Sequence, residues 1–170
     1  MAVLEIKKYP DNILRIKAEP VRKIDSTILS LIDDMTETMY AAPGVGLAAT
    51  QVGVSLRIMV VDVGLKEEGS GLIVLINPEI ISVHGEIEEE EGCLSVPDYK
   101  AQIKRAEIIT VRGLNKEGRE IEIESTSLLA RVIQHEIDHL NGVLIIDRMS
   151  PIKRELFKKK FRKVLKLMAH

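Results

Sequence analysis

Apolar residues recur every three or four positions in three parts of the chain, the spacing that places them on one face of a helix. The first helix is predicted to begin at Asp25 or Ser26, to run through Tyr40 and to end before Pro43. The apolar residues expected on one side of this helix are Leu29, Ile32, Met35 and Met39.

A second helix is predicted to begin at Thr126 or Ser127 and to stop at the Asn-Gly pair at 141–142. Between the two helices lie short runs that are rich in β-branched residues or alternate in polarity, and residues 115–118 are typical of a hairpin turn. The predicted strands are 57–63, 72–76, 80–83, 106–112 and 120–124. We therefore expect an α+β fold in which short antiparallel β-sheets surround the second helix.

The last part of the chain predicts an amphipathic helix that begins with Ser150 as cap and Pro151 at the first helical position. Residues 153–170 carry a net charge of +7, which leaves −9 on the first 152 residues. This basic helix is either a charged face in water or a surface that binds an anionic partner. The apolar stripe expected to pack is Phe157, Phe161, Val164, Leu165 and Met168.

Length and composition predict one domain spanning residues 1–170, since no repeat or low-complexity linker divides the chain and 170 residues can bury a core without disulfides. The single cysteine excludes an internal disulfide, and a thiolate ligand would favour a reducing compartment. No segment has the length and hydropathy of a signal peptide or a membrane span. We expect a cytoplasmic protein with neither a membrane nor DNA as partner.

The second helix carries the segment that is richest in chemistry, His135-Glu136-Ile137-Asp138-His139. Two histidines four positions apart lie on one helix face, where they can share a metal ion. The glutamate after the first histidine points toward the open position of the ion, where a carboxylate can take a proton from water. This HExxH pattern is typical of a hydrolytic metal site, although two histidines can also reach this spacing by accident.

A catalytic metal site of this kind needs a third protein ligand. The extended metalloprotease motif would place a histidine where this chain has Ile145. Of the other histidines, His84 adjoins a predicted glycine turn and His170 ends the chain. The remaining candidate is Cys93, whose neighbouring glycine permits close approach to another element. The alternative is that Cys93 is a small buried apolar residue.

Three segments, in this order, make the chain resemble the bacterial peptide deformylases over nearly all of its length. Relative to that family, Lys100 stands where some members carry arginine, and Arg131 stands where some carry an apolar residue. Both could alter the rim of the substrate site without touching its chemistry. The three segments are Gly44-Val45-Gly46-Leu47-Ala48-Ala49-Thr50-Gln51, Glu91-Gly92-Cys93-Leu94-Ser95 and Gln134-His135-Glu136-Ile137-Asp138-His139.

The resemblance implies a metal-dependent hydrolase that removes the formyl group from the formyl-methionine of new polypeptides and releases formate. The implied metal is iron(II), for which zinc, nickel or cobalt could substitute. Glu136 would transfer the proton, and the Gln51 side-chain amide and the Leu94 backbone N–H would stabilise the oxyanion. Spacing alone favours the alternative that Gln51 is a polar surface residue after a tight turn. The implied metal ligands are Cys93, His135 and His139.

A substrate pocket is expected on the metal side of the second helix. Its apolar walls would suit the unbranched side chain of methionine, although Leu128 and Val132 could instead belong to the core. Glycines in two of the matching segments would let an extended peptide pair with the backbone. The residues expected to bind substrate are Gly44, Val45, Gly46, Gly92, Leu94, Leu128, Arg131 and Val132.

An outer ion pair between Glu91 and Arg105 is also predicted. Alternation along a strand puts Glu91 on the same face as Cys93, and Arg105 is expected to begin a strand that returns beside it. Such a pair would support the metal ligands. The alternative is that Glu91 ends an acidic run in water and Arg105 is an ordinary surface charge.

Three functions are compatible with these residues. Measuring formate release from a formyl-methionyl peptide beside cleavage of an unformylated peptide would separate them. Beside the deformylase, the rivals are a zinc peptidase and a structural metal site on an RNA-binding module. For the deformylase, the resemblance favours a contact between the basic helix, residues 150–170, and ribosomal RNA phosphates, because this family acts on nascent chains.

Overall fold

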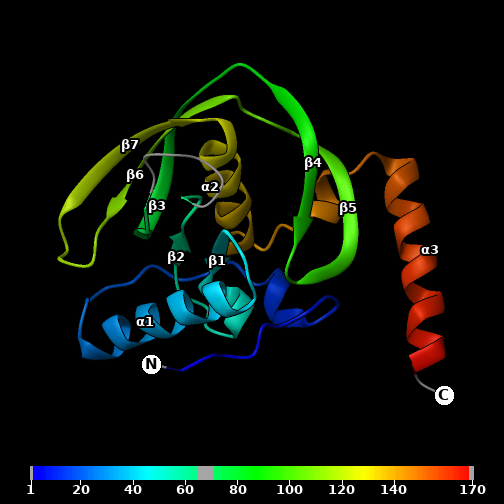
Figure 1. Ribbon diagram of the computed structural model, residues 1–170, viewed down its shortest axis with the longest axis horizontal. Helices are drawn as coiled ribbons and strands as arrows, with labels where there is room; N and C mark the ends of the chain where they lie inside the picture. Colours follow the sequence, from blue (N-terminus) through cyan, green and yellow to red (C-terminus); the bar gives the residue numbers. More distant parts are fainter. Residues whose placement is uncertain (1, 65–70, 169–170) are drawn as a thin grey trace.

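The computed structural model describes residues 2–64 and 71–168. They form two antiparallel sheets and three α-helices, which confirms the expected α+β class (Figure 1). One sheet has the strand order β1-β2-β3-β6-β7, and β4 and β5 pair only with each other within the described residues. The strands are β1 (Gly46–Ala48), β2 (Ile58–Val61), β3 (Ile73–His84), β4 (Ile87–Cys93), β5 (Val96–Arg105), β6 (Ile108–Leu114) and β7 (Glu120–Thr126). The helices are α1 (Ser26–Ala41), α2 (Ser127–Leu140) and α3 (Pro151–Met168), with short 3-10 helices at Asn12–Arg15, Ala49–Val52 and Ile145–Arg148.

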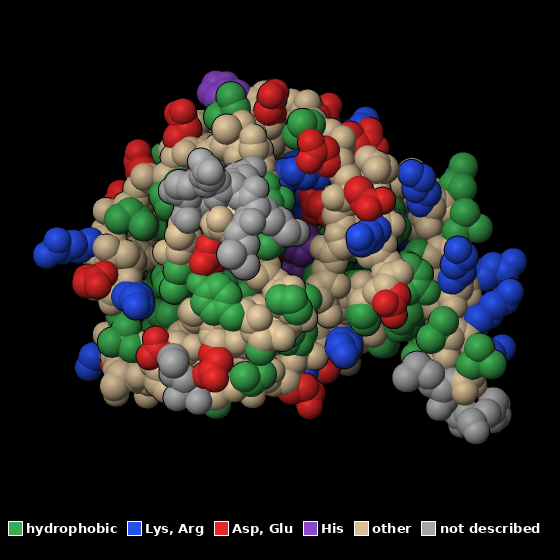
Figure 2. Space-filling model, in the orientation of Figure 1, with side chains coloured by type: hydrophobic (Ala, Val, Ile, Leu, Met, Phe, Trp, Pro, Cys, Tyr) green, Lys and Arg blue, Asp and Glu red, His purple; other side chains and the backbone are tan. Residues whose placement is uncertain are grey.

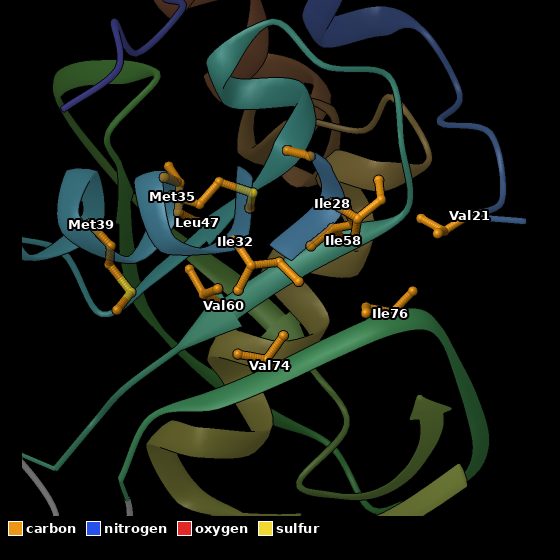
Figure 3. Close-up of a cluster of buried hydrophobic side chains, with 11 residues drawn as sticks. Val21, Ile28, Ile32, Met35, Met39, Leu47, Ile58, Val60, Val74 and Ile76 are labelled. Atoms are coloured by element: carbon orange, nitrogen blue, oxygen red, sulfur yellow. The ribbon is translucent and has the colours of Figure 1, made fainter. Parts of the chain in front are cut away.

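Helix α1 begins where the sequence predicts, because the Asp25 side chain accepts a hydrogen bond from the backbone of Ile28. The prediction of its buried face was wrong at Leu29, which is 38% exposed. Ile28 is buried in its place, since positions spaced four, three and four apart keep to one stripe and Leu29 lies about 100° away. Figure 3 shows the buried α1 side chains among those of β2 and β3; they are Ile28, Ile32, Met35 and Met39.

The predicted strands 72–76 and 80–83 are parts of one continuous strand, β3. The strand runs through the Asn-Pro sequence between them with an irregularity in its pairing with β6. Asn77 adopts a φ of 54°, a conformation that asparagine tolerates better than most residues. Its side chain also bonds both the N–H and the carbonyl of Val21, so the irregularity is held from a distant segment.

The β4–β5 hairpin, residues 87–105, was not predicted as a pair of strands. Glu91 lies opposite Ala101 in its register, and the turn brings Cys93 opposite Val96. Arg105 was expected to begin a strand, but it is the last residue of β5. The sequence placed only Glu91 and Cys93 on an extended segment, because Glu is depleted in strands and only the partner strand supplies the pairing.

Helix α2 lies between the five-stranded sheet and the β4–β5 hairpin (Figure 1). Its bounds match the prediction, and its apolar residues Ala130, Ile133 and Ile137 pack into a core with β2, β3 and β6. The opposite side of the helix faces the hairpin, where it presents polar groups. One helix thus joins a large apolar core to a polar interface.

Helix α3 stands beside the hairpin at the edge of the molecule (Figure 1). It packs through Phe157, whose ring lies 4.5 Å from that of Tyr99 and 5.7 Å from that of Tyr9, with Phe161 beside it. Val164 and Leu165 were expected to pack as well, but each is 42% exposed because the helix runs on past the body. The side chain of Met168 lies outside the described residues. Among the described residues, no helix is both long and apolar enough for a membrane crossing.

Candidate metal centre

Three side chains that can bind a metal meet between the hairpin and α2. Cys93 ends β4, and His135 and His139 lie one turn apart on α2. The Cys93 Sγ is 3.2 Å from Nε2 of His139, and the two histidine Nε2 atoms are 3.1 Å apart. Ordinary zinc–sulfur and zinc–nitrogen bonds in a tetrahedron imply separations of about 3.3 to 3.6 Å between ligand atoms. The two observed separations are a few tenths of an ångström shorter, and all three donor atoms lie within 4.8 Å of one another, so the donor set suits a divalent ion of this size after a small outward shift.

The electrostatic surroundings also suit a cation. Burial acts to lower the pKa of His135, but hydrogen bonds with Cys93 and Glu91 raise it well above its usual value, because negative groups crowd around this imidazole. Burial lowers the pKa of His139 well below its usual value, with a further contribution from the charge of His135. A divalent ion would satisfy the same negative groups and would leave both imidazoles neutral, as metal ligation requires.

The Nδ1 atoms of the two histidines differ in their hydrogen-bond partners. The Nδ1 atom of His135 is 3.1 Å from the Glu91 carboxylate, which turns Nε2 toward Cys93 and His139. The Nδ1 atom of His139 is buried and has no hydrogen-bond partner among the residues that the structure describes. His139 is held instead by its backbone, since Thr50 Oγ1 donates to its carbonyl oxygen.

Glu136 is buried beside the cluster and is 4% exposed. Burial raises its pKa to about 7, a value suited to a group that accepts and releases protons near neutrality. Its Oε1 atom has no hydrogen-bond partner within the described parts of the chain. A Cβ atom on Gly46 would lie 2.6 Å from the other carboxylate oxygen, so this glycine lets β1 approach the glutamate.

Gln51 is 1% exposed, so the alternative that it is a surface residue is wrong. Its Oε1 accepts from the backbone of Ala48 at 2.9 Å, and its Nε2 donates to Ser95 Oγ at 3.1 Å. The same Nε2 is 3.9 Å from the Cys93 Sγ. The amide of Gln51 is thus fixed with its donor toward Cys93. The side chain of Leu94, which follows Cys93, covers Gly44.

A cavity of about 1140 Å³ opens at this cluster and contains Cys93, His135, Glu136, Gln51 and Leu94 in its lining. Figure 2 shows a hollow near the centre of this face with histidine atoms at its base. The cavity also reaches all the other residues that were expected to bind substrate; they are Gly44, Val45, Gly46, Gly92, Leu128, Arg131 and Val132.

The Glu91 carboxylate lies at the centre of a buried charged network. Arg105 Nε and NH2 donate to its two oxygens at 2.9 and 2.8 Å, and Arg105 NH1 donates to Asp138 at 2.6 Å. Burial alone would raise the pKa of Glu91, but hydrogen bonds from Arg105 and His135 lower it to about 2. Arg105 is 5% exposed, so the alternative of an ordinary surface charge is wrong for it.

Sequence reasoning found only part of the role of Arg131 and missed two members of this network. Arg131 lines the cavity as expected, but it is 4% exposed rather than at an open rim, and its guanidinium donates to Glu91 at 2.7 Å. Asp138, inside the HExxH segment, binds both Arg105 and Arg148. The available signal for Asp138 was its position seven residues after Arg131, which puts the two side chains on one side of α2, where a buried carboxylate requires partners.

Comparisons with known proteins agree over almost the whole chain. A family model described as polypeptide deformylase matches residues 3–155. The peptide deformylase of Thermodesulfovibrio yellowstonii is 59% identical over 95% of this chain and 98% of its own, and that of Syntrophobacter fumaroxidans is 57% identical over 98% of each. A crystal structure of a peptide deformylase from Legionella pneumophila superposes with a TM-score of 0.90 at 48% identity, covering 99% of both chains.

Proposed function

The chain belongs to the peptide deformylase family, and we propose that Cys93, His135 and His139 hold the metal ion on which that family depends. The protein is a hydrolase that removes the formyl group from the N-terminus of new polypeptides and releases formate. The convergence of one sulfur and two imidazole nitrogens beside a buried carboxylate supports this assignment of the metal ligands. We further propose that residues 1–170 act as a single domain, since α2 contacts both sheets.

When bound, the ion would supply a Lewis acid that makes water a better nucleophile near neutral pH. Glu136 would accept the proton from that water as its oxygen attacks the formyl carbon, and would then deliver it to the leaving amine nitrogen. The carboxylate suits both steps, because a pKa raised toward 7 makes acceptance and release of the proton nearly balanced.

Negative charge on the formyl oxygen would be stabilised by the Gln51 side-chain amide and the Leu94 backbone N–H. Gln51 is supported in this role by its fixed orientation, because Ala48 holds its carbonyl oxygen and the NH2 group is turned toward Ser95 and Cys93. Removal of one such donor commonly costs about 10² to 10³ in rate.

The methionine side chain would lie among Val45, Leu94, Leu128 and Val132, all of which line the cavity. The peptide backbone would pair with the glycine-containing edges at Gly44, Gly46 and Gly92, as an added strand pairs with a sheet edge. A Cβ atom on Gly44 would lie 2.8 Å from the Leu94 side chain, which supports a close approach of these two segments around the substrate.

The decisive experiment compares two peptides and one variant. The protein should release formate from a formyl-methionyl peptide and leave an unformylated peptide intact. Cleavage of the unformylated peptide would favour a zinc peptidase, which also predicts a histidine or carboxylate as third ligand rather than Cys93. Formate release by the parent that is lost in Glu136→Ala would support the deformylase, whereas a metal-loaded protein that shows neither activity would favour a structural metal site on an RNA-binding module.

We propose iron(II) as the working ion, with zinc, nickel or cobalt able to occupy the same ligands. The order of affinities among divalent metals does not favour iron, so metal supply and redox chemistry would have to select it. Activity of the iron form should decay in air as the metal oxidises, whereas a nickel or cobalt form should last longer. A zinc form that is purified in air and is fully active would contradict the assignment of iron.

We place the reaction in the cytoplasm, at the ribosome, with helix α3 and its flanking residues, 150–170, in contact with ribosomal RNA. Eight basic residues between 153 and 170 support this, and residues 158–160 are all exposed lysines. Replacing Lys158, Lys159 and Lys160 by Glu should abolish salt-dependent cosedimentation with ribosomes. The same variant should deformylate a short free peptide at the parent rate, because these lysines lie outside the cavity lining.

A further inference from the structure

The three side chains proposed to bind the metal come from the β4–β5 hairpin and from helix α2, and the hairpin is not part of the five-stranded sheet. Cys93 belongs to the β4–β5 hairpin, and both histidines belong to α2. Among the described strands, β4 and β5 pair only with each other, so no ladder of backbone hydrogen bonds ties the hairpin to the five-stranded sheet. Side chains must therefore set where the cysteine arrives relative to the histidines.

Arg131 spans this junction from the helix side. It lies one turn before His135, and its guanidinium donates to the carbonyl oxygens of Glu89 on β4 at 3.1 Å and Ile103 on β5 at 3.0 Å. It also reaches the Ile87 carbonyl oxygen at 3.4 Å and the Glu91 carboxylate at 2.7 Å. One buried side chain thus holds both strands of the hairpin.

The chemistry of the guanidinium explains why arginine suits this position. A buried cation is costly unless its donors are satisfied, and arginine offers five donors in a rigid planar fork. Lysine has three donors on a flexible stem and could not hold two strands and a carboxylate in the same geometry. Arg105 makes the reciprocal connection, because it starts on the hairpin and reaches Asp138 on α2.

We propose that Arg131 is a positioning residue that holds the hairpin on α2, so that Cys93 stands at the two histidines before the ion binds. The residue need not touch substrate or metal to do this. The inference rests on the proposed metal site, and it predicts that loss of Arg131 loosens the cysteine even in metal-free protein. In the loaded enzyme, the same loss would let the ion escape faster.

The test uses the full chain with Arg131→Met and Arg131→Lys, and Arg112→Met as a matched control. Arg112 is a partly exposed arginine on β6 that faces Glu120 and Glu122, away from the cluster. In metal-free protein, alkylation of Cys93 by iodoacetamide should be about tenfold faster in Arg131→Met than in the parent. Arg112→Met should stay within about twofold, and Arg131→Lys should fail to restore the parent rate.

Cobalt(II) provides a second readout, because its thiolate absorption band reports the bond to Cys93 independently of turnover. Removal of cobalt by a chelator should be about 10- to 100-fold faster in Arg131→Met, the usual range for residues that support metal ligands. If Arg131→Met does not fold, Arg131→Lys carries both measurements. Alkylation and cobalt loss within about twofold of the parent in a folded variant would overturn the inference.

Failure of the proposed metal site and failure of the role of Arg131 would give different results. A parent protein that binds cobalt without a thiolate band would refute Cys93 as a ligand and with it the proposed metal site. A parent that shows the band, together with a variant that alkylates and loses cobalt at the parent rate, would refute only the role of Arg131.

Discussion

Two buried regions of the molecule differ in chemistry: one lies between α1 and the five-stranded sheet, and the other lies between α2 and the β4–β5 hairpin. The cluster between α1 and the sheet contains eleven buried apolar residues (Figure 3), and the buried Thr38 of α1 forms hydrogen bonds with backbone groups. The interface between α2 and the hairpin instead buries Arg105, Arg131 and Asp138, with Glu91 only slightly more exposed. The first region gains free energy from removing apolar surface from water, whereas the second gains little net free energy from its ion pairs.

The difference teaches what each kind of contact specifies. Apolar contacts tolerate exchange of one side chain for another of similar volume. Paired buried charges do not, because the loss of one partner leaves the other without its hydrogen bonds and costs about 3 to 5 kcal/mol. The charged interface is placed where a cysteine must meet two histidines, so fixed geometry is worth more there than stability.

The largest effect is expected at Glu136, which lies at the charged interface but pairs with none of its arginines. Glu136→Ala should lower kcat by about 10² to 10⁴, since it removes the group that transfers the proton. Metal content should stay at one equivalent, because Glu136 is not a ligand. Formate release and metal analysis on the same sample measure both, and near-normal turnover at equal metal content would refute the mechanism.

The apolar region should respond in stability rather than in rate. Met35 is fully buried between α1 and the sheet, so Met35→Ala should lower the free energy of unfolding by about 2 to 5 kcal/mol. The kcat per folded molecule should match the parent, because Met35 lies outside the cavity lining. Urea unfolding and active-site titration separate the two quantities, and a loss of kcat with unchanged stability would break the comparison between the regions.

The charged region should show the opposite pattern. Arg105→Ala should lower activity or metal retention by about 10- to 100-fold, because it releases both Glu91 and Asp138. Arg112→Ala, on the exposed face of β6, is the control and should change either quantity by less than about twofold. If the two arginine variants behave alike, the buried network contributes nothing specific to the site.

The smallest effect concerns acid. The pKa of Glu91 is about 2 in the folded protein against 4.5 for the unperturbed group, so this carboxylate stabilises the fold above pH 4.5 and loses that contribution as pH falls toward 2. Between pH 6 and pH 4 the parent should lose about 1 kcal/mol more stability than Glu91→Gln. Urea titrations at both pH values measure this, and equal losses would mean that Glu91 is not held as an ion.

The sequence predicted those parts of the protein that local rules govern. Helix α2 runs between the predicted cap and the predicted Asn-Gly stop, and α1 begins at Asp25. The structure also brings Cys93, at the end of a strand, to the two histidines that were expected to share an ion with it. Spacing four residues apart on a helix decides that two histidines share a face, whatever surrounds the helix.

Tertiary structure alone decided the rest. The acidic run of β4 was compatible with a solvated strand or a turn, and only β5 beside it decides between them. The error at Leu29 was different, because the spacing of Ile32, Met35 and Met39 already selects Ile28. Arg131 looked like a rim residue because its four hydrogen-bond partners lie 28 to 44 positions away in the sequence. A cation can be buried only where the folded chain brings it enough acceptors, and no local pattern records how many will arrive.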